Sequence, residues 1–463
     1  MKIVFTDTDG SISGTNIEPG WTTSKKFTVT NKSNETYKYN IVIQDLVNTF
    51  VTEGYLQYKI TSDNGGYNMS EFKDVPKSST VTDKVLAYSA SIDVGVTQTY
   101  TVEFIYRNDE SVDQNVDQNK VLSGKLFISI GTEEPTLYNK ILADNPTRET
   151  RTKFNSSYNL DNTNTLFTST ESINGSTLVD VYYYAGNATN NWLKFGKDSS
   201  NNDLYWRIIR TNHDKSTRLL YHGTSTTSTE AYIGTSKFNE NSNDPMYVGY
   251  KYGTSGSLEN NRLNTNDSTI KTYVDNWYKN NLTAYTKYLS NDAVYCNDRS
   301  LASGQSYSTT NRFNYAPYER IETNEQPTYN CTNLSDAFSV NNTSAKLDYP
   351  VGLMTIDEAI FAGGKGPETS TTWYYYNSKK ESSTNTTDWL LLSPSRFNSL
   401  PVGIVFHIHN SYLGAQSGNT YGMPLSESVS GTYAVRPVIS IKGELLWKSG
   451  DGSPSNPYEI EMN

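Results

Sequence analysis

The chain has 463 residues, of which 35% are hydrophobic and 19% charged, and its formal net charge is -10. This length suits two or three domains, and the composition excludes a highly charged disordered chain. The acidic balance, without a basic patch that interleaves aromatic residues, argues against a nucleic-acid partner.

The sequence contains neither an apolar run that could span a bilayer nor a signal peptide, although it begins abruptly with the strand-like MKIVFTDTDG. We expect that an export or anchor segment was removed, so that the chain meets a membrane only through this missing segment. Tyrosine is abundant, with 36 residues against 15 Phe and 7 Trp. Its ring buries area while its hydroxyl stays polar, so it suits both mixed β cores and contact surfaces.

Residues 1–132 are predicted to form a β domain. A turn signal at Ile17–Trp21 precedes Lys26–Asn31, which alternates in the manner of a half-buried strand. Further strand patterns, separated by Asp, Gly and Asn clusters, follow at 37–43, 85–91, 98–106 and 122–130. Several short strands at this spacing favour a β-sandwich.

Three stretches of this domain, IEPGWTTSKKFTVTNKSNETYKYNIVI, VGVTQTYTVEFIY and SGKLFIS, resemble the camelysin/TasA-type surface and biofilm-fibre domain of Gram-positive bacteria. The resemblance implies a jelly-roll-like or Ig-like β-sandwich that can assemble with other copies. Some members of that group are named as metallopeptidases. The domain here contains no His, so a zinc peptidase built on His-Glu-x-x-His is excluded.

The part of the chain that follows divides into two regions. Residues 133–165 are polar with little periodicity, and we predict a linker there. The second domain, 166–463, opens with strand patterns and a predicted hairpin whose arms are 205–210 and 218–221.

Two helices are predicted in the second domain. In the first, Asp267 or Ser268 caps a stripe of apolar residues at three- and four-residue spacing, and the helix ends near Leu282. In the second, Thr355 and Glu358 have capping-box spacing, and two glycines follow as a stop. Two helices among many short strands indicate an α+β domain, so the whole chain is predicted to be mainly β and α+β.

The chain has two cysteines, Cys296 and Cys331, in similar settings. An isolated pair in a chain rich in Tyr, Asn and Thr predicts one disulfide formed in an oxidising compartment. This bond would close a loop of about 36 residues and contribute roughly 4 kcal/mol on the chain-entropy model. The alternative is a pair of buried free thiols, whereas a metal site lacks a His close to either cysteine in sequence.

Residues 389–442 organise the second domain. The ends of this stretch, WLLLSPSRFN and GTYAVRPVISIK, are predicted core strands. Between them only Gly403–His409 alternates, and the remainder is rich in Ser, Asn, Tyr, Gln and Gly. This pattern favours a rigid frame that presents an irregular polar-aromatic face for binding.

Three segments of the second domain, Trp206–Arg210, Trp389–Ser395 and Val435–Val438, resemble the C-type-lectin-like fold. The branch is that of formylglycine-generating domains and the variable target proteins of diversity-generating retroelements. The end of the chain, GDGSPSNPYEI, is similar to that of uncharacterised surface proteins of gut Firmicutes. Retroelement targets concentrate their variation in the segment that corresponds to the polar face. The resemblance therefore implies eight ligand-binding residues: His407, His409, Asn410, Tyr412, Gln416, Asn419, Tyr421 and Ser426. The alternative is an ordinary solvated loop.

Several kinds of chemistry lack support in the sequence. His407 and His409 share one face of a strand by alternation, but a metal site needs a further ligand, and the nearest acidic residue, Glu427, is distant in sequence. No Gly-x-Ser-x-Gly elbow surrounds any Ser, and no Glu-Pro-Asn or Gln-Pro-Asp triplet supports calcium-dependent sugar binding. Formylglycine-generating relatives use a close cysteine pair with copper, but both cysteines here lie well before the corresponding region. We therefore expect no catalysis, no metal and no cofactor.

Arg436 lies inside an apolar strand, where its burial requires a carboxylate or several carbonyl partners. We interpret Arg436 and Trp389 as structural residues that brace the frame beneath the loops.

Together these patterns predict a secreted or surface-anchored bacterial protein that binds a protein or glycan ligand on another cell, phage or host surface. The first alternative is a structural subunit of a biofilm fibre that assembles through the β domain. The second is a degenerate enzyme of the formylglycine-generating group. A phage receptor-binding protein is also compatible with these domains.

Overall fold

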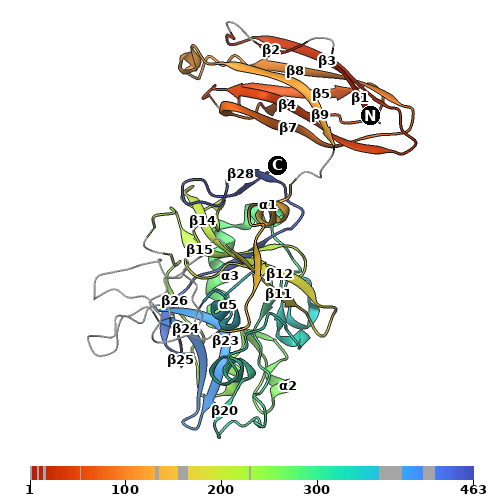
Figure 1. The fold of residues 1–463 in the computed structure, drawn as a ribbon. Coiled ribbons are helices and arrows are strands. Elements are labelled where there is room, and N and C mark those ends of the chain that lie inside the picture. The colour runs from red at the N-terminus through yellow and green to blue at the C-terminus, as the bar shows by residue number, and fades with distance from the viewer. Residues whose placement is uncertain are drawn as a thin grey trace. The chain divides into compact units, whose positions relative to one another are not determined.

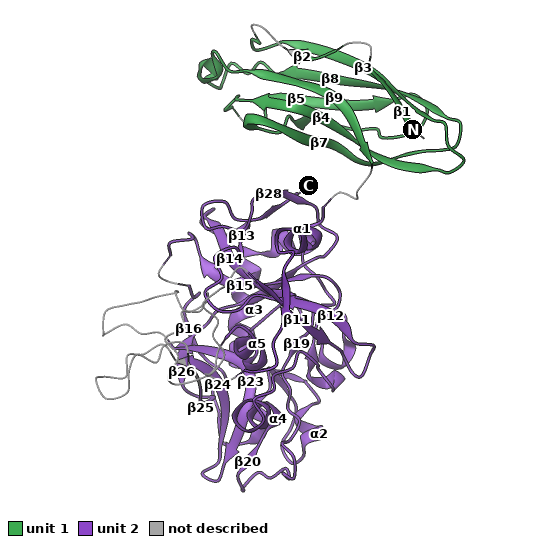
Figure 2. Ribbon diagram, in the orientation of Figure 1, with its two compact units in different colours: residues 1–134 green, residues 135–463 purple. Residues whose placement is uncertain are grey.

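The computed structural model divides the chain into two compact units, residues 1–134 and 135–463, each with its own hydrophobic core (Figure 2). Within the described part of the chain, no helix is both long enough and apolar enough to cross a membrane. The described residues are 3–7, 10–13, 17–52, 54–130, 135–154, 165–228, 231–363, 388–409 and 423–462.

Unit 1 consists of two antiparallel sheets whose side chains form one core (Figure 1). The five-stranded sheet has the order β1 (Ile3–Asp7), β3 (Thr22–Asn31), β8 (Thr97–Tyr106), β5 (Leu56–Ser62) and β6 (Lys73–Asp74). The four-stranded sheet has the order β2 (Ile12–Ser13), β9 (Leu122–Ile130), β4 (Tyr37–Asn48) and β7 (Ser78–Ile92). A short helix, η1 (Gln114–Asp117), precedes β9.

Tyrosines are part of the core of unit 1 because their hydroxyls are paired there. The ring of Phe27 stacks on that of Tyr100, with 4.9 Å between centroids, and both side chains are buried. Tyr39 is buried beside them, and its hydroxyl lies 2.6 Å from that of Tyr100 and 2.5 Å from Oε1 of Gln98. These bonds remove the penalty of burying the polar tips, which explains how a tyrosine-rich sequence fills a β core.

The described residues of unit 2 form two larger sheets and three short strand pairs. The eight-stranded sheet has the order β10 (Arg148–Thr150), β11 (Leu166–Glu171), β12 (Val179–Tyr183), β14 (Asp203–Thr211), β15 (Thr217–Gly223), β27 (Val438–Ile441) and β22 (Val351–Gly352), with β13 (Trp192–Lys197) paired to β14. The six-stranded sheet has the order β16 (Thr235–Lys237), β26 (Thr432–Ala434), β23 (Trp389–Asn398), β24 (Val402–His409) and β25 (Met423–Ser428), with β20 (Phe313–Asn314) paired to β23. The short pairs are β17 (Lys251–Tyr252) with β18 (Asn266–Asp267), β19 (Tyr295–Cys296) with β21 (Ala337–Phe338), and β28 (Trp447–Ser449) with β29 (Glu459–Ile460).

The helices of unit 2 are short and lie between the strands. They are α1 (Leu137–Asp144), η2 (Pro245–Val248), α2 (Leu258–Asn261), α3 (Thr269–Asn281), η3 (Thr283–Tyr288), α4 (Ala316–Tyr318), η4 (Glu319–Thr323), η5 (Leu334–Asp336), η6 (Thr343–Ala345) and α5 (Ile356–Phe361). Sheets with few helices confirm the predicted mainly β and α+β class.

Both helices predicted from sequence are present, with the predicted caps. Ser268 accepts a hydrogen bond from the backbone N–H of Lys271 and begins α3, and Leu282 follows its last residue. Thr355 and Glu358 form a complete capping box at the start of α5. The predicted hairpin is also present, as β14 and β15.

Much of the predicted linker, 133–165, belongs to unit 2. Helix α1 packs Leu137 and Ile141 into the core of unit 2, and β10 pairs with β11 in parallel. Residues 135–150 are therefore part of unit 2, and the prediction of a linker is wrong for them. Because α1 is short and polar on one side, its stability comes from this packing and not from a strong local signal.

Candidate functional site

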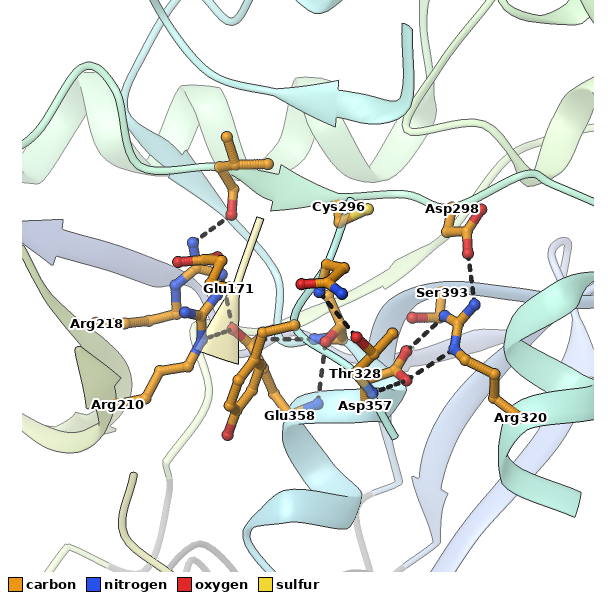
Figure 3. A pocket seen from close by; sticks show the side chains of 14 residues that line it. Glu171, Arg210, Arg218, Cys296, Asp298, Arg320, Thr328, Asp357, Glu358 and Ser393 are labelled. Atoms are coloured by element: carbon orange, nitrogen blue, oxygen red, sulfur yellow. Dashed lines mark hydrogen bonds and ion pairs between the residues drawn. The ribbon is translucent and has the colours of Figure 1, made fainter. Parts of the chain in front are cut away.

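Helix α5 begins with two adjacent acidic residues, Asp357 and Glu358, that bind different arginines beside a small polar cavity (Figure 3). The cavity has a volume of about 20 Å³, which is enough for about one water molecule. Three arginines and four carboxylates line it, which makes these residues the candidate site.

Glu358 binds the arginines of two neighbouring strands. Its Oε1 accepts hydrogen bonds from Nε of Arg210 in β14 at 2.9 Å and from Nη1 of Arg218 in β15 at 2.8 Å. Arg210 also donates from Nη2 to Oε1 of Glu171, at the end of β11, over 2.9 Å. All four side chains are at most 3% exposed. Glu358 therefore links α5 to β14 and β15, and Arg210 extends the connection to β11.

Asp357 binds a third arginine on the other side of the cavity. Arg320 of η4 donates from Nε to Oδ1 of Asp357 at 3.0 Å and from Nη2 to Oδ2 at 2.9 Å. Its Nη1 donates to Oδ2 of Asp298 at 2.7 Å. The two-bond contact between a guanidinium and a carboxylate fixes both distance and orientation, so it connects η4 rigidly to α5.

Helix α5 is also bonded to the six-stranded sheet. The backbone N–H of Ile356 donates to the hydroxyl of Ser393 in β23 at 3.0 Å. In the same strand, the N–H of Leu392 donates to the carbonyl oxygen of Met354 at 2.8 Å. Because α5 thus joins both large sheets, we refer to the charged residues around it as the ion cluster: Glu171, Arg210, Arg218, Asp298, Arg320, Asp357 and Glu358.

The arginines of the ion cluster keep Glu171 and Glu358 ionised. Burial alone would raise the pKa of Glu171. The charge of Arg210 and the hydrogen bond from His213 outweigh this effect and lower the pKa to about 2. Burial likewise opposes ionisation of Glu358, and the charges of Arg218 and Arg210 overcome it, so its pKa is lowered. The two carboxylates are thus charged partners of guanidinium groups, an arrangement that braces a structure.

His213 makes the stability of this cluster depend on pH. Its Nδ1 lies 3.3 Å from Oε2 of Glu171, and Asp214 and Arg210 are its other charged neighbours. Burial lowers the pKa of His213, but the hydrogen bond and charge of Glu171 raise it above the usual value of about 6.5. The charged pair of His213 and Glu171 therefore stabilises the folded state fully below pH ~6.5, and this stabilisation is lost as the pH rises through the raised pKa of His213.

We accordingly expect His213→Asn to destabilise unit 2 at pH 6 and to approach the stability of the unmodified chain at pH 9. The measurement is urea unfolding of both proteins across this range. A difference that stays constant with pH would show that the charge of His213 contributes nothing.

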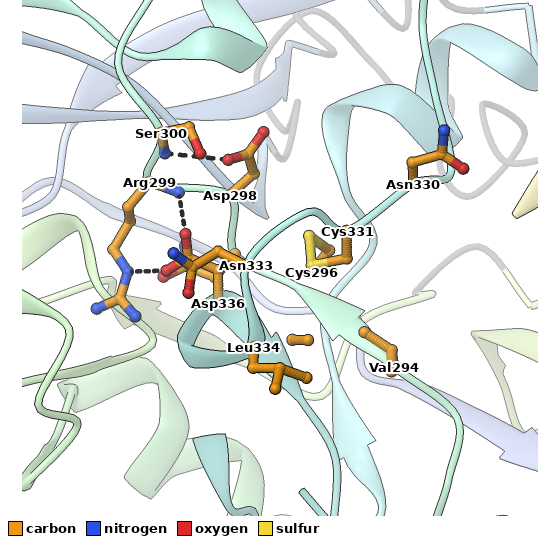
Figure 4. The surroundings of a disulfide bond; sticks show 12 residues. Val294, Cys296, Asp298, Arg299, Ser300, Asn330, Cys331, Asn333, Leu334 and Asp336 are labelled. Atoms are coloured by element: carbon orange, nitrogen blue, oxygen red, sulfur yellow. Dashed lines mark hydrogen bonds and ion pairs between the residues drawn. A yellow bond between two sulfur atoms is a disulfide. The ribbon is translucent and has the colours of Figure 1, made fainter. Parts of the chain in front are cut away.

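The two cysteines form one disulfide, between β19 and the segment 328–331 (Figure 4). This segment covers the ion cluster: the ring of Tyr329 lies 4.3 Å from the guanidinium of Arg210 and 4.0 Å from the ring of Phe361. The N–H of Cys331 donates to the carbonyl oxygen of Ser172, next to Glu171, at 3.0 Å. The disulfide thus fastens the cover of the cluster to the neighbouring strand.

Three further carboxylates, Asp267, Asp275 and Asp348, converge at a distance suited to a metal ion. Nζ of Lys271 occupies the position between them, at 3.2, 2.5 and 2.7 Å respectively, and its side chain is fully buried. Burial raises the pKa of Asp275 to about 6. The chain's own ammonium group therefore serves as the cation of this group.

Strand β24 is buried on both faces, so it does not present one face for binding. Residues 404–408 are at most 6% exposed, and His407 is 1% exposed. The ring of His407 stacks on Tyr433 with 5.1 Å between centroids, and its Nε2 lies 3.5 Å from Oδ2 of Asp388. The prediction that His407 is an exposed contact residue is therefore wrong: β24 lies between β23 and β25, and its side chains from Ile404 to Ile408 are covered on both faces.

The other predicted binding residues fall into two groups. Ser426 is half-buried in β25, and its hydroxyl lies 2.9 Å from that of Ser395 in β23. His409 ends β24 opposite Met423, the first residue of β25. Five predicted residues, together with the side chain of His409, lie outside the described residues: Asn410, Tyr412, Gln416, Asn419 and Tyr421.

Arg436 and Trp389 lie together in the core. The guanidinium of Arg436, which is 1% exposed, donates from Nε and Nη2 to the carbonyl oxygen of Tyr221 at 3.2 and 3.0 Å. Its centre is 4.9 Å from the ring of Trp389. Two guanidinium N–H groups thus share one carbonyl oxygen, and the ring of Trp389 covers the charged group, which offsets part of the cost of burying an arginine in an apolar strand.

Sequence reasoning did not identify the ion cluster. The sequence nevertheless contained a signal that could have revealed it: a charged residue inside an apolar strand, the same pattern that drew attention to Arg436. Arg210 follows Ile208-Ile209, and Arg218 precedes Leu219-Leu220. Two buried cations on adjacent arms of a hairpin require carboxylates from elsewhere in the chain, although the sequence does not say which ones.

Comparisons with known proteins add little to this geometry. No protein-family model and no curated protein matches the chain. One similar solved structure is "AvmM Catalyzes Macrocyclization in Alchivemycin A Biosynthesis", at 14% identity over 30% of this chain and 93% of that one, with a TM-score of 0.17. Another is the sporulation control protein Spo0M from Bacillus subtilis, at 10% identity over 48% of this chain and 79% of that one, with a TM-score of 0.12. Likenesses this weak carry no argument about fold or function, and they support neither resemblance expected from the sequence.

Proposed function

We propose that this chain is an extracellular bacterial protein that binds a protein or glycan ligand without catalysing a reaction. In this proposal unit 1 is a jelly-roll-like or Ig-like sandwich and unit 2 has a C-type-lectin-like fold, as the two resemblances imply. The residues proposed to contact the ligand are those of the 410–422 segment, namely Asn410, Tyr412, Gln416, Asn419 and Tyr421.

The observation that carries this proposal is the way both ends of that segment are held. His409 and Met423 face each other as the last pair of the β24–β25 ladder, and the preceding residues of β24 are buried in the frame. Residues 410–422 are rich in Asn, Ser, Tyr and Gly. Tyr supplies contact area at a low entropic cost and Ser and Asn adapt their hydrogen bonds, so this composition on a rigid support resembles a binding loop.

The disulfide supports an extracellular setting and a rigid frame. The disulfide suits an oxidising compartment, and it fastens the cover of the ion cluster inside unit 2. The ion cluster then keeps the two large sheets in a fixed arrangement. The positions of β24 and β25, which flank the 410–422 segment, therefore do not depend on the sequence of that segment.

The double variant Tyr412→Ala/Tyr421→Ala is expected to lose at least about tenfold in affinity, since two anchoring aromatic rings each contribute more than ~1 kcal/mol to a typical interface. The probes are an array of cell-surface glycans and immobilised bacterial envelopes. Tyr138→Ala/Tyr182→Ala, which removes two half-buried tyrosines from other elements of unit 2, is the matched control and should bind normally.

Equal binding by both variants would contradict the proposal, provided that circular dichroism shows both to be folded. Filaments of the unmodified chain in electron micrographs, without binding to any probe, would favour the fibre subunit instead. The fibre alternative is supported by Ile130 and Phe127 of β9, whose apolar side chains are 84% and 38% exposed.

A further inference from the structure

The beginning and the end of unit 2 are paired with each other. The N–H of Trp447 donates to the carbonyl oxygen of Pro135 at 2.9 Å, and the N–H of Leu137 donates to that of Leu445 at 2.8 Å. Between these bonds Thr136 and Leu446 form an antiparallel bridge. We refer to residues 135–137 and 445–447 together as the clasp; it lies where α1 and β28 run side by side (Figure 1).

The last strand of unit 2 is attached to the same place. The N–H of Glu461 donates to the carbonyl oxygen of Leu446 at 2.9 Å, and β29 pairs with β28. Tyr458, which is fully buried, bonds through its backbone to Trp192 and Lys194 of β13. The C-terminal half of the clasp is therefore anchored to the eight-stranded sheet.

The N-terminal half of the clasp has fewer attachments. Besides its two rungs, α1 buries Leu137 and Ile141, and Nζ of Lys140 lies 4.7 Å from the ring of Trp447. The end of α1 is attached through two side chains: Oδ2 of Asp144 accepts from the hydroxyl of Tyr458 at 2.7 Å, and the amide of the buried Asn145 bonds to Tyr184 and Asn190. The next strand pairing along the chain is β10, which begins at Arg148. Residues 135–147 lie outside the ladders of the two large sheets, so they can separate while those ladders stay paired, once the clasp, the packing of α1 and these side-chain bonds are broken.

We propose that the clasp carries the mechanical load on unit 2: tension between the two ends of the unit passes through residues 135–137, 445–447 and 459–461. The six-stranded sheet and the ion cluster branch off this path and bear no load while the clasp is closed. The proposal rests on the pairing of the ends and does not depend on the proposed ligand.

The geometry also determines what opens first. In an antiparallel pair pulled apart from Pro135, the rungs break one after another rather than together, because the load falls on the bond nearest the pulled end. The first event is therefore detachment of residues 135–147, at a lower force than the large sheets need. About a dozen freed residues, at ~3.5 Å each less the length they span when folded, give an extension of roughly 30 Å.

Force spectroscopy on the full chain, held by its N- and C-termini, tests this proposal. We expect the early extension of roughly 30 Å before any larger unfolding step. Thr136 and Leu446 are the closely spaced kind of antiparallel pair, with Cα atoms about 4.5 Å apart, which suits a disulfide. In Thr136→Cys/Leu446→Cys, closed by oxidation, the early extension should disappear while later steps remain.

Two controls separate the clasp from a general effect of the substitutions. Thr136→Cys alone removes the side chain that caps α1 and should lower the force of the early extension without abolishing it. Handles at Leu178 and Leu400, which are 57% and 79% exposed, place the sheets in the load path and should give no early extension. An early extension that persists in the closed double variant, or unit 2 opening from its ends in one step, would overturn the proposal.

Discussion

Replacing Glu358 by Gln is expected to lower the free energy of unfolding of unit 2 by about 3–5 kcal/mol, the usual cost of breaking a buried ion pair from one side. The Gln amide keeps the shape of the side chain but removes the negative charge. Arg210 and Arg218 then remain buried, at no more than 3% exposure, with only Glu171 to balance two positive charges. The capping box of α5 is weakened at the same time, because Oε2 of Glu358 accepts from the N–H of Thr355.

Urea unfolding followed by tryptophan fluorescence measures this loss, since all tryptophans except Trp21 belong to unit 2. The matched control is Glu459→Gln. Glu459 is 26% exposed and pairs with Lys194 at 2.7 Å, so its loss should change stability by less than ~1 kcal/mol. If the two variants were equally stable, the ion cluster would not be the brace that joins the sheets.

The elements that were predicted correctly carry short-range signals. The capping box of α5 lies within four residues, and the β14–β15 hairpin is defined by two apolar arms and the turn between them. In both cases the residues that determine the conformation are near neighbours in sequence. The same holds for α3, where Ser268 and the apolar stripe that follows it are sufficient.

The strand β24 shows what a single strand pattern cannot decide. Ile404, Phe406 and Ile408 alternate with Val405 and His407, which is typical of a strand with one solvated face. The pattern does not reveal whether the second face is covered, because that depends on Tyr433 and Asp388, which come from other parts of the chain. A histidine with such partners is compatible with a core, so its polarity misled the assignment of the binding face.

The ion cluster could not be predicted from the sequence for a related reason. Its members Glu171, Arg210, Arg218 and Glu358 are spread over four elements, and only the folded sheet brings them together. Sequence indicates that a buried arginine needs a partner, but the choice among 49 acidic residues is made by tertiary structure. Prediction from the sequence therefore identified the strands of the frame and missed the group that joins them.

Removing the disulfide, by Cys296→Ser together with Cys331→Ser, is expected to lower the free energy of unfolding of unit 2 by roughly 4 kcal/mol on the chain-entropy model. The bond closes a loop with a sequence separation of 35, so its loss mainly gives freedom to the unfolded chain. The folded state keeps its cover, because Cys331 remains bonded through its backbone to Ser172 and the N–H of Thr328 to Asp357.

The two largest expected effects, those of the double cysteine variant and of Glu358→Gln, therefore have different origins. A change in the unfolded chain should leave the folded structure, and hence binding by unit 2, intact at temperatures where the double variant is still folded. Glu358→Gln instead weakens the folded state itself, and it should loosen the connection between the sheets before the unit unfolds. Hydrogen exchange of the backbone N–H groups of Ile356 and Leu392 distinguishes them: it should accelerate in Glu358→Gln more than in the cysteine variant at equal global stability. Equal acceleration in both would mean that α5 and β23 open only with the whole unit.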